Sequence, residues 1–181
     1  GNPPEYNKSV RDFDVVTLDR VKKIPVEPDL DVWKEYAYKE GIHPAILSYL
    51  NLRNSYFYKM ETTVEGRKFA TPRGWEDLSR MMEVCEQLGK DITEALVIQY
   101  IQHERISQEF AEYYELYQKY QQDYQIAEIL KGQNSESMVK KVAHASFDEK
   151  VSVVNLLFSG VRQAIRQVIL REEVLDQVFA V

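Results

Sequence analysis

The stretch "ATPRGWEDLSRMM", residues 70–82, contains the clearest helix start in the chain. Thr71 is a favourable N-cap residue, and Pro72 suits the first helical position. We expect Glu76 and Asp77 to lie in the first turn, where negative charge is favourable. The pattern predicts an amphipathic helix that ends near Gly89, with an apolar face formed by Trp75, Leu78, Met81 or Met82, Cys85 and Leu88.

Arg73 is out of place in this helix start. The first turn of a helix presents backbone N–H groups without intrahelical partners, together with the positive end of the helix dipole. A guanidinium group adds a second positive feature there, and the two together favour a bound anion. The residues alone leave a simpler interpretation open, in which Arg73 folds back on Glu76 or Asp77.

The composition is that of an ordinary globular protein. The 181 residues are 44% hydrophobic and 29% charged, which suffices for a buried core. A net charge of −6 argues against a nucleic-acid partner. The single cysteine, Cys85, fits a reducing compartment and a core position better than a role as nucleophile. Because we find neither a membrane-spanning run nor a signal-peptide pattern, we expect no membrane partner and a cytoplasmic location.

Residues 1–28 differ from the rest of the chain because they are rich in proline and turn formers. They contain one short strand-like stretch, residues 20–26. A strand needs a sheet to join, and the remaining sequence offers little sheet. We therefore expect this N-terminal strand fragment to be the end of a larger domain.

From residue 29 onward the pattern is mostly helical, and the predicted fold class is mainly α. In chain order we expect helices over residues 29–41, with Asp29 or Asp31 as N-cap, and 44–50, a small β-hairpin over 56–70, the helix from Thr71, and helices over 91–102, 106–124, 135–144 and 147–171, then a last short helix with Val174, Leu175 and Val178.

An aromatic stripe marks the helix predicted over residues 106–124. Apolar residues recur there every three or four positions: Ile106, Phe110, Tyr113, Tyr117, Tyr120 and Tyr124. Such a stripe could stack nucleic-acid bases. In an acidic chain, however, the spacing favours a helix that packs its aromatic face on its neighbours.

No motif in the chain indicates a catalytic centre of its own. His43, His103 and His144 are far apart and have no ligand spacing, so we expect no bound metal. We also find no nucleophile motif, no GxxxxGK[ST] phosphate loop and no apolar strand that ends in paired acids. Asn2, Arg20 and Arg73 remain as polar residues in unusual positions. Taken singly, Asn2 could be a turn former and Arg20 a surface charge beside Asp19.

Three motifs, taken together and in order, resemble the C-terminal half of an AAA+ ATPase of the MoxR-like group. "GNPPEYN" matches the asparagine-proline pair that ends a strand in that family, and "TLDRVKKI" matches its "LDRF" segment. "ATPRGWEDLSRMM" matches the "TPRSW" or "TPRGW" of its helical lid. The resemblance covers roughly residues 1–90, and Val21 departs from the phenylalanine that is common in the family.

The resemblance implies a role for each of the three unusual residues. Asn2 is expected to be sensor 1, which positions the attacking water near the γ-phosphate. Arg20 is expected to be the arginine finger, presented to the nucleotide of a neighbouring subunit. Arg73 is expected to be sensor 2, which reaches the γ-phosphate of its own subunit. All three suit phosphoryl transfer, which is catalysed mainly by positioning and charge stabilisation.

The resemblance also implies a division of the chain and a set of partners. Residues 1–28 would be the end of the AAA+ core, residues 29–99 a helical lid-type bundle with sensor 2, and residues 100–181 a C-terminal helical extension. ATP and Mg²⁺ would bind the parent protein, and none is expected on this fragment, which lacks the phosphate loop. The parent is expected to form a homo-oligomeric ring, a hexamer by family analogy, that remodels a partner protein such as one with a von Willebrand factor A domain. The alternative is a free-standing helical protein-interaction module.

Overall fold

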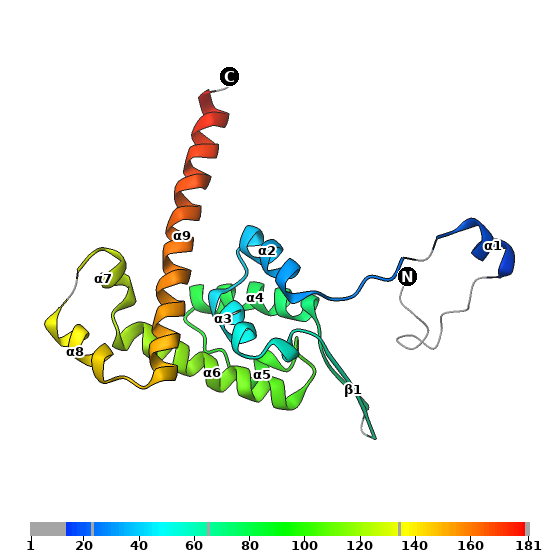
Figure 1. The fold of residues 1–181 in the computed structure, drawn as a ribbon, viewed down its shortest axis with the longest axis horizontal. Coiled ribbons are helices and arrows are strands. Elements are labelled where there is room, and N and C mark those ends of the chain that lie inside the picture. Colours follow the sequence, from blue (N-terminus) through cyan, green and yellow to red (C-terminus); the bar gives the residue numbers. More distant parts are fainter. Residues whose placement is uncertain (1–13, 23, 65, 134, 180–181) are drawn as a thin grey trace.

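The computed structural model describes residues 14–22, 24–64, 66–133 and 135–179, and its fold is mainly α with one small hairpin (Figure 1). The elements are, in chain order, α1 (Val15–Arg20), α2 (Leu30–Glu40), α3 (Pro44–Leu52), the 3-10 helix η1 (Asn54–Tyr56), β1 (Lys59–Thr63), β2 (Gly66–Ala70), α4 (Pro72–Gln87), α5 (Glu94–Val97), α6 (Glu104–Asp123), α7 (Ile126–Leu130), α8 (Glu136–His144) and α9 (Phe147–Phe179). The mainly α fold class with a small hairpin is confirmed.

The predicted N-terminal strand fragment is wrong. Arg20 is the last residue of α1, whose N-cap Asp14 accepts a hydrogen bond from the Thr17 backbone N–H at 2.8 Å. The described residues between α1 and α2 form no strand, and all of them up to Asp29 are exposed. A strand needs an edge with which to pair, and the sheet in the described part of the chain pairs only β1 with β2. Figure 1 shows α1 apart from the helical body.

The starts of α2 and α3 follow from local capping, as the sequence predicts. The Asp29 carboxylate accepts hydrogen bonds from the backbone of Asp31 and Val32, so Asp29 rather than Asp31 is the cap. Gly41 ends α2 with a φ of 75°, a left-handed conformation that glycine adopts without strain. His43 then caps α3, because its Nδ1 accepts from the Ala45 backbone N–H at 3.1 Å.

The hairpin joins α3 to α4 and projects away from the body (Figure 1). Its antiparallel register pairs Lys59 with Ala70 at the base and Thr63 with Gly66 near the tip. The base is held to the body because Phe69 N–H donates to the carbonyl of Gln102 at 2.8 Å. Since α4 begins two residues after β2, this anchorage also fixes where α4 starts.

An aromatic cluster lies where α3, α4 and α6 meet. Trp75 is fully buried, and its indole Nε1 donates to the carbonyl of Tyr56 at 3.1 Å. The ring of Phe110 lies 5.4 Å from that of Trp75 and 5.2 Å from that of Tyr49, both edge-on. Of the predicted stripe, Ile106, Phe110, Tyr117 and Tyr124 are buried, and Tyr113 and Tyr120 are partly buried against the same core. The stripe therefore packs in the core, as expected, and is not a platform for bases.

The helix predicted over residues 91–102 is mostly wrong, because only the single turn α5 forms there. The last two carbonyls of this segment bond to residues outside it. Ser107 Oγ donates to the carbonyl of Ile101 at 2.6 Å, and Phe69 N–H takes the carbonyl of Gln102. The local sequence favours a helix, but only one turn forms, and these tertiary hydrogen bonds hold the end of the segment.

The C-terminal region contains one long helix instead of two. The separate short helix predicted around Val174, Leu175 and Val178 is wrong, because α9 runs without a break to Phe179. The first half of α9 packs on the body through Val153 and Leu156, which are buried. In Figure 1 the second half extends beyond the other helices.

Candidate functional site

The start of α4 is built by the residues that surround Arg73. Thr71 is the N-cap, and its Oγ1 accepts a hydrogen bond from the Gly74 backbone N–H at 3.1 Å. Pro72 occupies the first helical position, where a missing N–H costs nothing. Gly74 allows a close approach, since a Cβ there would lie 2.6 Å from the carbonyl oxygen of Tyr100. With Trp75 in the core, four residues of the motif have a structural role.

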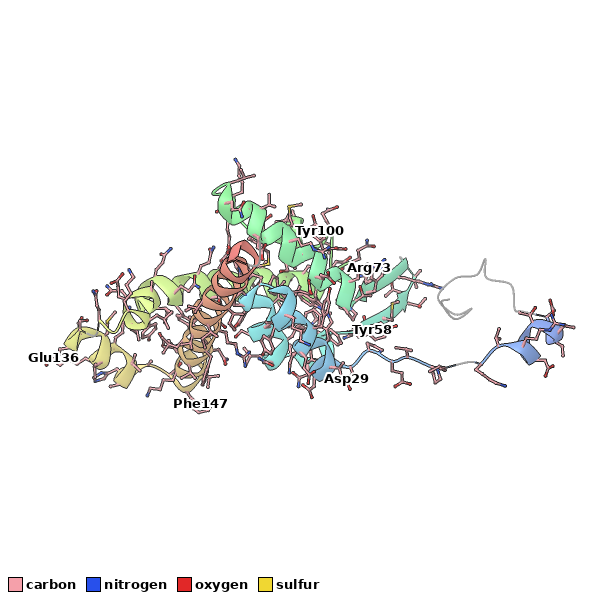
Figure 2. The ribbon with its side chains drawn as sticks, turned by 90° about the horizontal axis from the view of Figure 1, so that it is seen from above. Asp29, Tyr58, Arg73, Tyr100, Glu136 and Phe147 are labelled. Carbon is pink, nitrogen blue, oxygen red and sulfur yellow. The ribbon has the colours of Figure 1, made fainter. Side chains whose placement is uncertain are left out.

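Arg73 is the remaining residue of this motif, and no contact within the described part of the chain gives it a structural role. Its side chain is exposed, and it forms no hydrogen bond or ion pair with the residues that the structure describes. The fold-back on Glu76 or Asp77 does not occur, because Arg80 pairs with both carboxylates instead, at 3.4 Å in the case of Asp77. Glu76 also accepts from the Tyr36 hydroxyl at 3.1 Å. Figure 2 labels Arg73 at the start of α4, close to the hairpin.

The electrostatics of this helix start favour an anion. The expectation that Glu76 and Asp77 lie in the first turn is wrong: α4 begins at Pro72, and its first turn contains no acidic residue. The positive end of the helix dipole is therefore left without negative charge, and the Arg73 guanidinium adds to it. A phosphate oxygen placed there would meet both favourable interactions.

The structure does not bring the other two expected site residues to Arg73. Arg20 is exposed at the end of α1, and both Figure 1 and Figure 2 show α1 well away from α4. Asn2 lies outside the described residues. The roles given to Arg20 and Asn2 therefore remain predictions.

A second group of polar residues, which sequence patterns did not indicate, lies toward the other end of α4. The Nε2 of His43 is 3.0 Å from Glu86 Oε1, and Tyr114 donates its hydroxyl proton to the same oxygen at 2.5 Å. Because Nδ1 of His43 accepts the capping bond from Ala45, Nε2 carries the proton and donates to Glu86. The hydrogen bond from His43, then that from Tyr114, lowers the pKa of Glu86 below its ordinary value of 4.5. Burial raises the pKa of Tyr114, and its bond to Glu86 adds to this.

This polar group connects three helices and does not form a reaction centre. It contains an ionised carboxylate held by two donors, from α3 and α6, with His43 itself buried. The only sequence signal was the position of His43 directly before a proline, which is typical of a helix start. We assign the group to the attachment of α4 to its neighbours.

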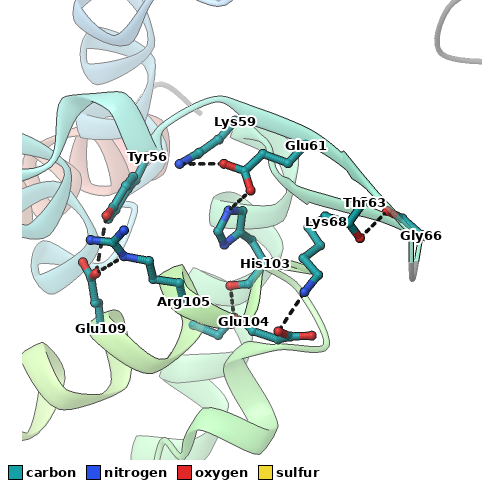
Figure 3. Close-up of polar contacts among 11 residues, drawn as sticks. Tyr56, Lys59, Glu61, Thr63, Gly66, Lys68, His103, Glu104, Arg105 and Glu109 are labelled. Atoms are coloured by element: carbon teal, nitrogen blue, oxygen red, sulfur yellow. Dashed lines mark hydrogen bonds and ion pairs between the residues drawn. The ribbon is translucent and has the colours of Figure 1, made fainter.

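A third polar cluster ties the hairpin to the start of α6 (Figure 3). On β1, Glu61 contacts Lys59 at 2.9 Å and the buried His103 ring at 3.3 Å. On β2, Lys68 pairs with Glu104 at 2.9 Å. The ion pair with Lys59 is the main cause of a lowered pKa of Glu61.

The same view shows a smaller set of contacts at the next turn of α6. Arg105 donates to Glu109 at 2.7 Å, and the Tyr56 hydroxyl donates to the same oxygen at 3.4 Å. The Arg105–Glu109 pair is exposed, and contacts of this kind orient an element more than they stabilise it, whereas the Tyr56 hydrogen bond is partly buried. The cluster around Glu61 and Lys68 therefore orients the hairpin and, through it, the start of α4, whereas the Tyr56 contact links η1 to α6.

We find no alternative site with stronger chemistry in the described part of the chain. No group of three or more histidine, cysteine, aspartate or glutamate residues there is arranged to hold a metal ion. None of the described helices is both long and apolar enough to cross a membrane. Comparison with protein-family models, with curated proteins and with solved structures gave no match to this chain.

Proposed function

We propose that this chain is the lid and C-terminal helical part of a MoxR-like AAA+ ATPase, and that Arg73 is its sensor-2 residue. One observation carries the proposal. In the motif from Thr71 to Trp75 every residue except Arg73 serves the fold, and Arg73 is exposed at a helix start without acidic residues. An exposed cation at the positive end of a helix is explained by an anionic ligand.

In this proposal Arg73 contacts the γ-phosphate of ATP bound to its own subunit. The charge on the phosphoryl oxygens is spread in the transition state, so a guanidinium held at a fixed position lowers the barrier. The hairpin and Trp75 hold α4, and therefore Arg73, in place. Arg20 acts on the nucleotide of the neighbouring subunit in a ring, and Asn2 positions the attacking water.

The remaining parts of the nucleotide site belong to the segment upstream of residue 1. In this proposal that segment contains the phosphate loop and the acidic residues that would bind Mg²⁺. When bound, the metal ion would neutralise charge on the phosphates. The parent protein hydrolyses ATP in the cytoplasm as a ring, hexameric in this proposal, and remodels a protein partner. A partner protein with a von Willebrand factor A domain is the kind of partner that the resemblance to the MoxR-like group implies.

The coding sequence upstream of residue 1, together with a binding measurement, tests the proposal. We expect a GxxxxGK[ST] phosphate loop to be encoded about a hundred residues before Asn2, the distance that the family resemblance implies. We expect calorimetric titration of ATP into residues 1–181 alone to show weak binding or none. A start codon at residue 1, or tight ATP binding by the chain alone, would contradict the proposal.

A second candidate function, a helical protein-interaction module without nucleotide chemistry, is favoured by a different observation. The solvent-exposed side of α9 carries apolar residues, among them Phe158, which is 64% exposed, and Ile165, which is 54% exposed. Exposed apolar faces of this kind mark sites of protein contact. The upstream coding sequence separates the two candidates, since an interaction module requires no phosphate loop.

A further inference from the structure

The backbone between α5 and α6 lies against the first turn of α4. A Cβ at Gly74 would lie 2.6 Å from the carbonyl oxygen of Tyr100 and 3.3 Å from Cδ1 of Ile101. Gly74 directly follows Arg73, so the side chains of Arg73 and Tyr100 leave the backbone at neighbouring points. Figure 2 labels both residues in this part of the molecule. A ligand that Arg73 binds therefore lies close to Tyr100.

The hydroxyl group of Tyr100 has no hydrogen-bond partner among the residues that the structure describes. Its ring is partly buried against the hydrophobic core, an arrangement that leaves the polar end of a tyrosine for a partner outside the core. The hydroxyls of five other tyrosines donate to side chains of this chain: Tyr36, Tyr56, Tyr113, Tyr114 and Tyr124. Tyr49 also lacks a partner, but its hydroxyl is buried.

Two hydrogen-bond donors without partners therefore stand side by side at the start of α4. The guanidinium of Arg73 offers several N–H donors in one plane, and the phenol of Tyr100 offers one O–H donor. The first turn of α4 contains no acidic residue that could accept from them. A phosphate group has enough acceptor oxygens for both, and hydrogen bonds to an ionised acceptor are the strong ones.

We propose that Tyr100 is a second binding residue of the Arg73 site, and that its hydroxyl donates a hydrogen bond to an oxygen of the same γ-phosphate. This inference rests on the proposed function, because it needs ATP at Arg73. It also goes beyond the resemblance, which covers roughly residues 1–90 and so does not include Tyr100. The segment that leads into α6 then contacts the nucleotide directly.

Steady-state ATP hydrolysis by the intact protein tests this role with Tyr100→Phe, which removes only the hydroxyl and keeps the ring. We expect kcat to fall about tenfold, the usual loss for one hydrogen bond to a charged group. The KM for ATP should change less, because the contact strengthens as charge develops on the phosphoryl oxygens. The matched control is Tyr124→Phe, which removes a hydroxyl that donates to Glu149 at the other end of α6 and should leave kcat unchanged.

The double variant Arg73→Ala, Tyr100→Phe separates a shared ligand from a structural role. If both side chains bind one phosphate, loss of the hydroxyl should lower kcat by a smaller factor when Arg73 is already absent. A structural role would give the same factor with and without Arg73. It would also lower the free energy of unfolding, and urea unfolding of Tyr100→Phe should show no such loss.

The possible results distinguish failure of this inference from failure of the proposed function. If Arg73→Ala lowers kcat and Tyr100→Phe does not, Tyr100 is not a binding residue, and the role of Arg73 stands. Equal factors for Tyr100→Phe with and without Arg73 would also overturn the shared contact. If neither variant changes kcat, both the proposed function and this inference are wrong.

Discussion

Arg73 costs the folded chain stability at the position where it stands. It adds positive charge to the start of α4, where the first turn holds no acidic residue and the side chain has no partner among the described residues. A residue that opposes the fold in this way is expected at a functional site, because function and stability place different demands on it. Thr71, Gly74 and Trp75, in contrast, each make a contact that holds the helix start.

Replacing Arg73 by glutamate should therefore stabilise the isolated chain. A carboxylate in the first turn interacts favourably with the helix dipole, so Arg73→Glu should raise the free energy of unfolding by about 0.3–1 kcal/mol. The matched control is Arg80→Glu on the same helix. It removes the ion pairs with Glu76 and Asp77 and should lower the free energy of unfolding. Unfolding in urea measures the free energy of unfolding of both variants. A marked loss of stability with Arg73→Glu would mean that the arginine has a structural partner.

At the scale of elements, α4 is held at its start by the hairpin and toward its end by Glu86. The Glu86 carboxylate accepts from His43 of α3 and from Tyr114 of α6, so three helices meet at one charged group. Because the pKa of Glu86 in the folded chain lies below its ordinary value of 4.5, folding favours the ionised form. This contribution to stability is complete above pH 4.5 and is lost as the pH falls through the lowered pKa.

Glu86→Gln should consequently flatten the acid dependence of stability. The glutamine cannot titrate, so the loss in free energy of unfolding below pH 4.5 should be smaller than in the unaltered chain. At neutral pH the variant should be less stable, since a charge-assisted hydrogen bond becomes a neutral one. Urea unfolding at a series of pH values measures the slope, with Glu83→Gln on the same helix as control. Equal slopes for Glu86→Gln and the unaltered chain would contradict this account.

The sequence predicted those elements whose ends are set by nearby residues. Asp29 with Gly41, and Thr71 with Pro72, mark helix ends through local hydrogen bonds and backbone geometry, and these ends are correct to within a residue or two. Within residues 91–102 only the turn α5 is helical, and the end of the segment is held by Phe69 and Ser107, contacts that no local pattern reveals. The same holds for Glu86, whose partners lie 43 and 28 residues away in the sequence.

Across the whole molecule, one buried cluster joins residues that the resemblance assigns to different parts. Trp75 of the expected lid packs on Phe110 of the expected extension, and Leu156 of α9 belongs to the same core. Residues 29–99 and the first part of the extension therefore share one hydrophobic core, so a substitution that disturbs the packing of α4 also disturbs the packing of α6. The predicted division at residue 99 between lid and extension is not a boundary of the hydrophobic core. It stays a prediction about function.

The central claim, that Arg73 senses the γ-phosphate, is tested most directly by steady-state ATP hydrolysis in the intact protein. Arg73→Ala should lower kcat by about 10²-fold or more, the usual loss when one group that stabilises transition-state charge is removed. Arg80→Ala, on the same helix and also exposed to solvent, should leave kcat nearly unchanged. Since Arg73 has no partner among the described residues, the unfolding transition of Arg73→Ala should match that of the unaltered protein. A kcat that Arg73→Ala does not change would contradict the account.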